Sequence, residues 1–143
     1  MRHLFWVLPV AICLVICGCA VSETPPTPLV TTDAGVSVPV RLGTYGWTTR
    51  SHGIQSDAPV PDEFAATMAP VSVPPGSALT VHYGYEPCEL YACLWHDHKP
   101  TRVETTGGSL QVPEASGTYV YSLEATWKEG HASHVLSVTI TPE

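Results

Sequence analysis

The sequence of 143 residues has few charged side chains, and basic ones are the scarcest. Lysine and arginine together number 6 against 13 aspartate and glutamate residues, which gives a formal net charge of -7 at pH 7. Proteins that bind nucleic acids present a basic patch or stripe, and this sequence has neither. The same shortage excludes electrostatic docking on anionic lipid as the way in which the chain is held at a membrane.

The usual signatures of catalysis are also missing. The sequence contains no G-x-S-x-G, S-x-x-K or H-E-x-x-H motif and no glycine-rich loop for phosphate. Ser51, His52 and Asp57 supply the residue types of a hydrolytic triad, but a triad is defined by geometry and not by composition. We therefore expect a protein that is not an enzyme and that uses no cofactor.

The longest apolar run lies at the start of the chain, from Leu4 to Ile16, after the positive charge of Arg2. It is too short to cross a bilayer, which takes about 20 apolar residues. A positive start, a short apolar run and small residues after it are typical of a secretory signal.

The four residues Ile16-Cys17-Gly18-Cys19 fit the lipobox of bacterial lipoproteins. In this interpretation residues 1–18 are the signal peptide, cleavage follows Gly18, and Cys19 carries the lipid on its sulfur. The alternative is an ordinary signal peptide cleaved near Ala20. We expect a chain anchored by lipid to the extracytoplasmic face of the cell membrane, with the membrane as its partner through Cys19.

Residues 19–35 are rich in threonine and proline and show no apolar period, which predicts an extended tether. The apolar pair Leu29-Val30 leaves a first edge strand as the alternative. Residues 36–143 then form a single domain.

Apolar residues alternate along several runs of that domain, as in half-buried strands. The alternating residues are Val36, Val38, Val40 and Leu42; Leu79, Val81, Tyr83 and Tyr85; Tyr119, Tyr121, Leu123, Ala125 and Trp127; and His134, Leu136, Val138 and Ile140. Short turns predict a hairpin around residues 128–131 and a second one at Gly107-Gly108. One helical turn is expected from Pro61. The pattern predicts an all-β fold, an immunoglobulin-like antiparallel sandwich of about seven strands.

Some segments resemble a group of small uncharacterised lipoproteins of Gram-positive bacteria. They are LGTYGWTT, VPPGSALTVHYGYEP and the closing VPEASGTYVYSLEATWKEGHASHVLSVTI. The resemblance implies an envelope location and a β-sandwich, and it implies no chemistry. The group has cysteine within a G-[ST]-Y-C-W motif where this chain has Gly46, and its partner cysteine is missing too.

Residues 88–98, CELYACLWHDH, contain two cysteines and two histidines. An even pair of cysteines outside the cytoplasm predicts a disulfide between Cys88 and Cys93, which requires a bend between them. The departure from the resembling group agrees, since one disulfide would replace another. Free thiols and a metal site are the alternatives, and a metal site needs a turn within residues 93–98, which contain neither glycine nor proline.

His96 and His98 share a face if they lie on a strand, and with other histidines they could chelate copper or zinc at the surface. Solvated histidines are the simpler expectation, except for His134, whose position in its run places it in the core. The alternative function is therefore extracytoplasmic metal binding.

Nine tyrosine and tryptophan side chains in one small domain are enough for a core and an exposed cluster. Tyr45 and Trp47, beside a loop, are the first candidates for a surface that binds a protein, peptide or glycan. The expected function is a lipid-anchored extracytoplasmic module with a binding or envelope-structural role.

Overall fold

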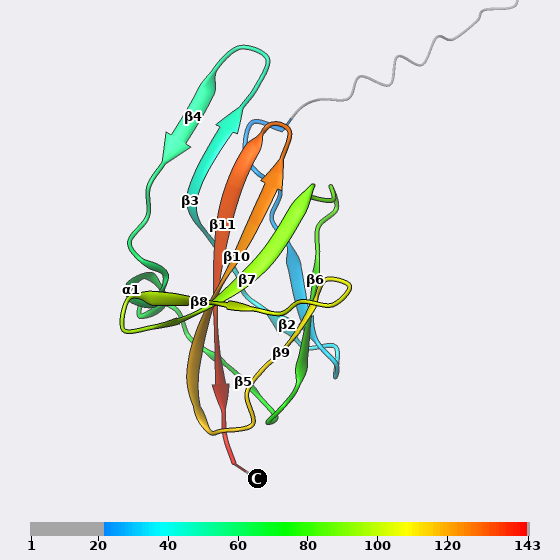
Figure 1. Cartoon of the computed structure of the whole chain (residues 1–143), viewed down its shortest axis with the longest axis vertical. Coiled ribbons are helices and arrows are strands. Elements are labelled where there is room, and N and C mark those ends of the chain that lie inside the picture. The colour runs from blue at the N-terminus through cyan, green and yellow to red at the C-terminus, as the bar shows by residue number, and fades with distance from the viewer. Residues whose placement is uncertain (1–21, 143) are drawn as a thin grey trace, which may run out of the picture.

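The computed structural model describes residues 22–142, which contain eleven strands and one short helix (Figure 1). The strands form two sheets, antiparallel except for one parallel pair, that pack face to face. The predicted all-β antiparallel sandwich is confirmed, with more strands than the expected seven. The predicted signal peptide, its cleavage after Gly18 and the lipid on Cys19 lie outside the described residues.

The smaller sheet has four strands. Their order is β2 (Ser37–Val38), β1 (Leu29–Thr32), β6 (Ala78–His82) and β9 (Ser109–Gln111). Its inward residues alternate with polar ones and are buried; they are Val30, Val38, Leu79, Val81 and Leu110.

The larger sheet has seven strands. Their order is β4 (Gly53–Ser56), β3 (Arg41–Thr48), β11 (Gly130–Ile140), β10 (Gly117–Trp127), β7 (Glu89–His96) and β8 (Lys99–Val103), and β5 (Val71–Val73) pairs in parallel with β11. Trp127 pairs with Gly130, so Lys128 and Glu129 form the turn of the predicted β10–β11 hairpin.

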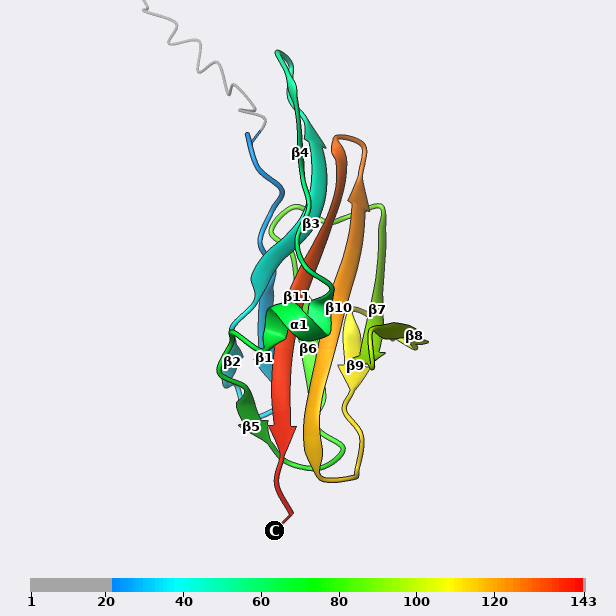
Figure 2. The ribbon, with the colours of Figure 1, turned by 90° about the vertical axis from the view of Figure 1, so that its left-hand side faces the viewer.

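The core lies between the sheets and follows the predicted alternation along β6, β10 and β11. The prediction is wrong for Val36 and Tyr85, which are exposed, and the predicted run Val36–Leu42 is divided between β2 and β3, which lie in different sheets. Trp127 is buried edge-on against Trp47 and Tyr83, with ring centroids 5.5 and 5.2 Å away. Strand β11 is buried on both faces, because Val135 is covered as completely as Leu136. Figure 2 shows the cause: helix α1 (Pro61–Ala65) lies over the outer face of β11 and β10, and it also contacts β7.

The tether prediction is wrong from the first described residues onward. Strand β1 is an interior strand, paired with β2 on one side and β6 on the other, so it is not an edge strand either. Pro25 and Pro28 are buried before it begins. Val30 and Thr32 alternate along β1, and both side chains are buried in the core. The segment is therefore a strand because the smaller sheet needs these residues to complete its inner face.

The second predicted hairpin is also wrong. Gly107 and Gly108 do form a turn, with φ of 58° and 76°, but the strands before and after it lie in different sheets. Strand β8 pairs with β7 through the two-residue turn Asp97-His98, whose φ values are 47° and 61°. Positive φ at both central residues is the geometry of a tight hairpin turn, and aspartate tolerates it better than most residues.

Candidate functional site

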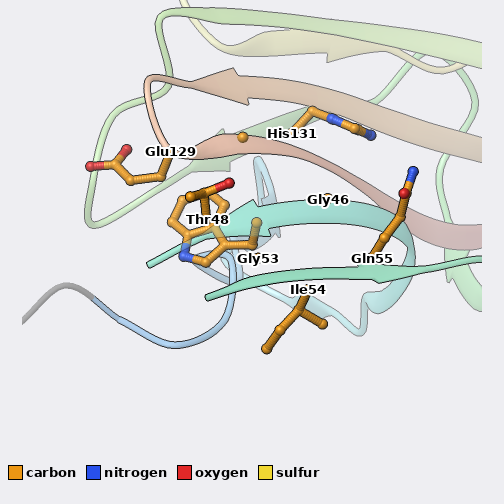
Figure 3. Close-up of a pocket in the computed structure, with 9 residues that line it drawn as sticks. Gly46, Thr48, Gly53, Ile54, Gln55, Glu129 and His131 are labelled. Carbon is orange, nitrogen blue, oxygen red and sulfur yellow. The ribbon is translucent and has the colours of Figure 1, made fainter. Parts of the chain in front are cut away.

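A hollow of about 470 Å³ opens between β3, β4 and the start of β11 (Figure 3). It is lined by Gly46, Trp47, Thr48, Gly53, Ile54, Gln55, Glu129, Gly130 and His131. Three of these residues are glycines, so part of the wall is bare backbone.

Strand register places His131, Gly46 and Gln55 in one row across the outer face of the sheet. Gly46 pairs with His131 on one side and with Gln55 on the other. Figure 3 shows His131 and Gln55 on the same side of the strands and Ile54 on the opposite side. A Cβ atom at Gly46 would lie 3.0 Å from Cε1 of His131, so the imidazole occupies the space that a side chain there would need.

The β10–β11 turn is held tightly against β3. The amide of Thr48 donates to the carbonyl oxygen of Glu129 at 2.8 Å. Gly130 has φ of 154°, and a Cβ atom there would collide with the carbonyl oxygen of Gly46. Only glycine therefore allows the turn and β3 to approach this closely.

The Glu129 carboxylate forms the outer rim of the hollow and is only 13% exposed. The hydroxyl of Tyr85 donates to both of its oxygens, at 3.0 and 3.2 Å, and Nζ of Lys128 lies 3.7 Å away. Desolvation and then this carboxylate raise the pKa of the Tyr85 hydroxyl, which therefore stays protonated as a donor. Imidazole, carboxamide and carboxylate groups suit the hollow to hydrogen bonding with a polar ligand.

Tyr45 and Trp47, the predicted candidates for an exposed binding surface, do not form one. Trp47 is 2% exposed, its ring packs in the core, and Tyr45 packs partly buried against the same core. The Trp47 ring Nε1 donates to the carbonyl oxygen of Ser22 at 2.9 Å. The two residues are two apart on β3 and face inward, while Gly46 between them faces the hollow side.

The predicted Cys88–Cys93 disulfide is contradicted, since both thiols are free. Strand β7 runs without a bend from Glu89 to His96, pairing with β10 on one side. Five extended residues separate the two Cα atoms by roughly 16 Å, and bridged cysteines need less than about 7 Å. Burial, and then the Glu124 charge, raise the pKa of the Cys93 thiol.

His96 and His98 do not share a strand face, because β7 ends at His96. His98 lies in the β7–β8 turn, where its amide donates to Oδ2 of Asp62 at 2.8 Å and its Nδ1 lies 3.1 Å from Oδ1. The hydrogen bond between the two side chains, and then the charge of Asp62, raise the pKa of His98. The side chain of His96 is 89% exposed beside Asp97. Within residues 22–142, no group of three or more His, Cys, Asp or Glu side chains is arranged to hold a metal.

Ser51 and His52 lie at the exposed tip of the β3–β4 hairpin, with Oγ and Nδ1 2.9 Å apart. Thr49 also bonds to both the His52 carbonyl and its ring, so these contacts shape the tip itself. No hydrogen bond among the described residues joins Asp57 to His52.

The row of His131, Gly46 and Gln55 is absent from the sequence-based candidates. Its signal was the pair of glycines in YGW and KEGH, which mark close backbone approach on two strands. Register was the missing information, because nothing local places Gly46 opposite His131.

No protein-family model, curated protein or solved structure shows significant similarity to this chain. The fold and site place the described residues in the class of all-β antiparallel sandwiches. None of the helices in the described part of the chain has the length and apolar character needed to span a membrane.

Proposed function

We propose that this protein is a lipid-anchored, extracytoplasmic binding module that takes an extended segment of a partner protein at β4 and the hollow beside it. The proposal of an anchor rests on the lipobox at residues 16–19 and on the resemblance to small lipoproteins. One structural observation carries the binding role, and it is the difference between the two edges of the larger sheet.

The two edges of the larger sheet differ in protection. Strand β8 forms one edge with the sequence KPTRV, in which Lys99, Pro100 and Arg102 hinder the addition of another strand. Strand β4 forms the other edge with GIQS, which contains no charge and no proline. An edge of that kind offers unpaired backbone groups to an extended peptide.

The hollow lies beside this edge and adds groups that recognise side chains. Gln55, His131 and Glu129 offer hydrogen bonds, and Ile54 offers an apolar contact on the opposite face of β4. Backbone pairing along β4 would supply affinity, and these side chains would select the sequence of the partner segment.

The anchoring part is tested by mass spectrometry of the mature protein from its host. We expect an N-terminal peptide beginning at Cys19 with a diacylglyceryl mass, and a larger uncleaved precursor when lipoprotein signal peptidase is inhibited. Cys19→Ala should abolish both the lipid mass and recovery in the membrane fraction. An unmodified N-terminus at Ala20 or beyond would contradict the anchor.

The binding part is tested by photocrosslinking in cells. A photoreactive residue at Gln55 on β4 is compared with one at Thr101 on β8, which is also exposed. We expect a discrete protein adduct from position 55 only, and its loss in Gly53→Pro, because the N–H of Gly53 points away from β3 and proline there blocks pairing along the free edge. Identical adducts from both positions, or an adduct that survives Gly53→Pro, would count against β4 as the binding edge.

A further inference from the structure

We infer that the end of the sandwich carrying the β3–β4 hairpin rests on the headgroups of the membrane to which the chain is anchored. This inference rests on the proposed lipid anchor at Cys19 and adds a fixed orientation to it. An anchored domain on a loose tether would sample many orientations, whereas this domain has almost no slack between lipid and fold.

The first described residue is already bound to the sandwich. The carbonyl oxygen of Ser22 accepts a hydrogen bond from Nε1 of Trp47, a core ring that is packed edge-on against Trp127. Pro25 and Pro28 are buried between Ser22 and the start of β1. Proline also restricts the backbone, so this segment costs little entropy to hold in place.

Only three peptide units join Cys19 to Ser22. At no more than about 3.6 Å per residue they reach roughly 11 Å. The lipid-bearing sulfur therefore lies within a short distance of Ser22 in any conformation of those residues. The membrane surface must come equally close to the end of the domain where Ser22 is bound.

That end is the one from which the β3–β4 hairpin projects. In Figures 1 and 2 the described chain begins beside the β10–β11 turn, and the hairpin tip extends beyond both. The C-terminus and the loop between β9 and β10 lie at the opposite end. Strand β10 alone has 11 residues, or roughly 37 Å at about 3.4 Å per residue, so the two ends are well separated.

The chemistry of the hairpin suits a headgroup layer. Residues 43–56 contain no carboxylate, although the whole chain has a net charge of -7. The exposed tip presents Arg50 and the hydroxyl of Ser51, which can bond to lipid phosphate. One basic residue near an anionic surface is worth about 1 kcal/mol, so the tip follows the anchor and does not replace it.

The orientation restricts the partner of the hollow. The hollow lies between β3, β4 and the β10–β11 turn, and therefore at the membrane-proximal end. A partner segment that binds there must reach the membrane surface, which favours a protein that is itself anchored or embedded in the same membrane.

The test measures the distance of each end from the bilayer in the lipidated protein. Ser51→Cys at the tip and Ser116→Cys in the β9–β10 loop each carry a fluorophore, in a background of Cys88→Ser and Cys93→Ala. The proteins are placed in nanodiscs of phosphatidylcholine and phosphatidylglycerol that contain a headgroup-labelled nitroxide lipid. We expect quenching at position 51 to exceed that at position 116 by at least about fivefold, since the two ends are tens of ångströms apart.

Two further variants test the cause. A flexible insert of about twelve glycine and serine residues after Ala20 adds roughly 20 Å of mean reach, and it should bring the two quenching values close together. Trp47→Phe keeps the core ring but removes the bond to Ser22, and it should reduce the difference; Trp95→Phe, which loses a bond to Ser122 instead, should not.

Equal quenching at both ends of the lipidated protein would overturn the orientation and leave the anchor intact. Undiminished quenching at position 51 after the insertion would overturn the explanation that the short segment between Cys19 and Ser22 fixes the orientation. Failure of the proposed anchor is a different result, because a chain without lipid would not be recovered in the nanodiscs.

Discussion

The Nδ1 atom of His134 lies 3.2 Å from the hydroxyl oxygen of Tyr83 in the core between the two sheets. Both side chains are buried, and Nε2 of His134 has no hydrogen-bond partner among the described residues. Burial lowers the pKa of His134 to about 4 and raises the pKa of Tyr83. The pair is therefore neutral in the folded protein, and a proton on His134 would be an uncompensated charge in the core.

Lowering the pH should destabilise the fold through His134. Its folded-state pKa of about 4 is below the ordinary value of 6.5, so the unfolded chain binds more protons between these values. The stabilisation is complete above pH 6.5 and is lost as the pH falls toward 4, by on the order of 3 kcal/mol. Urea unfolding followed by tryptophan fluorescence across this range measures it.

His134→Leu is the matched control for that loss. It removes the titrating group and keeps a side chain that can fill the core, so its free energy of unfolding should fall much less between pH 6.5 and 4. If the two proteins lose the same stability over that range, His134 is not the group responsible.

The two cysteines should differ in reactivity and remain unlinked. Cys88 is exposed, whereas Cys93 is buried and its thiol pKa is raised, so less thiolate is available there. We expect alkylation of native protein to label Cys88 at once and Cys93 only after unfolding, as mapped by peptide mass spectrometry. A disulfide-linked Cys88–Cys93 peptide under non-reducing conditions would contradict the unbent strand β7.

Alanine substitutions of three glycines around the hollow should form a graded series. Gly130→Ala should cost about 2 kcal/mol or more, because the new Cβ strikes the Gly46 carbonyl and the φ of 154° disfavours alanine. Gly46→Ala should cost about 1 kcal/mol, since the His131 ring can move aside. Gly53→Ala meets nothing closer than 3.8 Å and should change stability by less than about 0.5 kcal/mol. Chemical denaturation ranks them, and equal losses would refute the close approach.

Asp62→Asn should lower the pKa of His98. The hydrogen bond to Asp62 and its charge raise that pKa, so the pair stabilises the fold below pH 6.5 and less as the pH rises through the folded pKa of His98. NMR titration of the histidine side chains measures the change. His134 contacts Tyr83 and not Asp62, so its titration should stay unchanged and serves as the internal control.

Alternation predicted the core strands well because it reflects burial directly. The inward residues of β10 and β11 were all in the predicted register, and the β10–β11 hairpin formed where its short turn indicated. Pairing across larger distances was not predictable in the same way. The turn at Gly107-Gly108 was correct, but whether it joins one sheet or two depends on where β6 and β7 lie.

The candidate site shows the same division. Tyr45 and Trp47 were the candidates for an exposed binding surface, but no local pattern told which face of β3 meets the core. Cys88 and Cys93 were expected to bond because of their compartment and number. Pairing of β7 with β10 and β8 keeps the chain between them extended, and that pairing is non-local.

The sequence alone determined the class of fold and the inward faces of β10 and β11, since each follows from residues close together in the chain. The tertiary structure alone decided that residues 22–32 belong to the sandwich, that the two thiols stay apart, and that Gly46, Gln55 and His131 meet. The physical reason is that strand register and sheet membership depend on the packing of the whole core. A short segment fixes which of its residues alternate, but not which strand it finds.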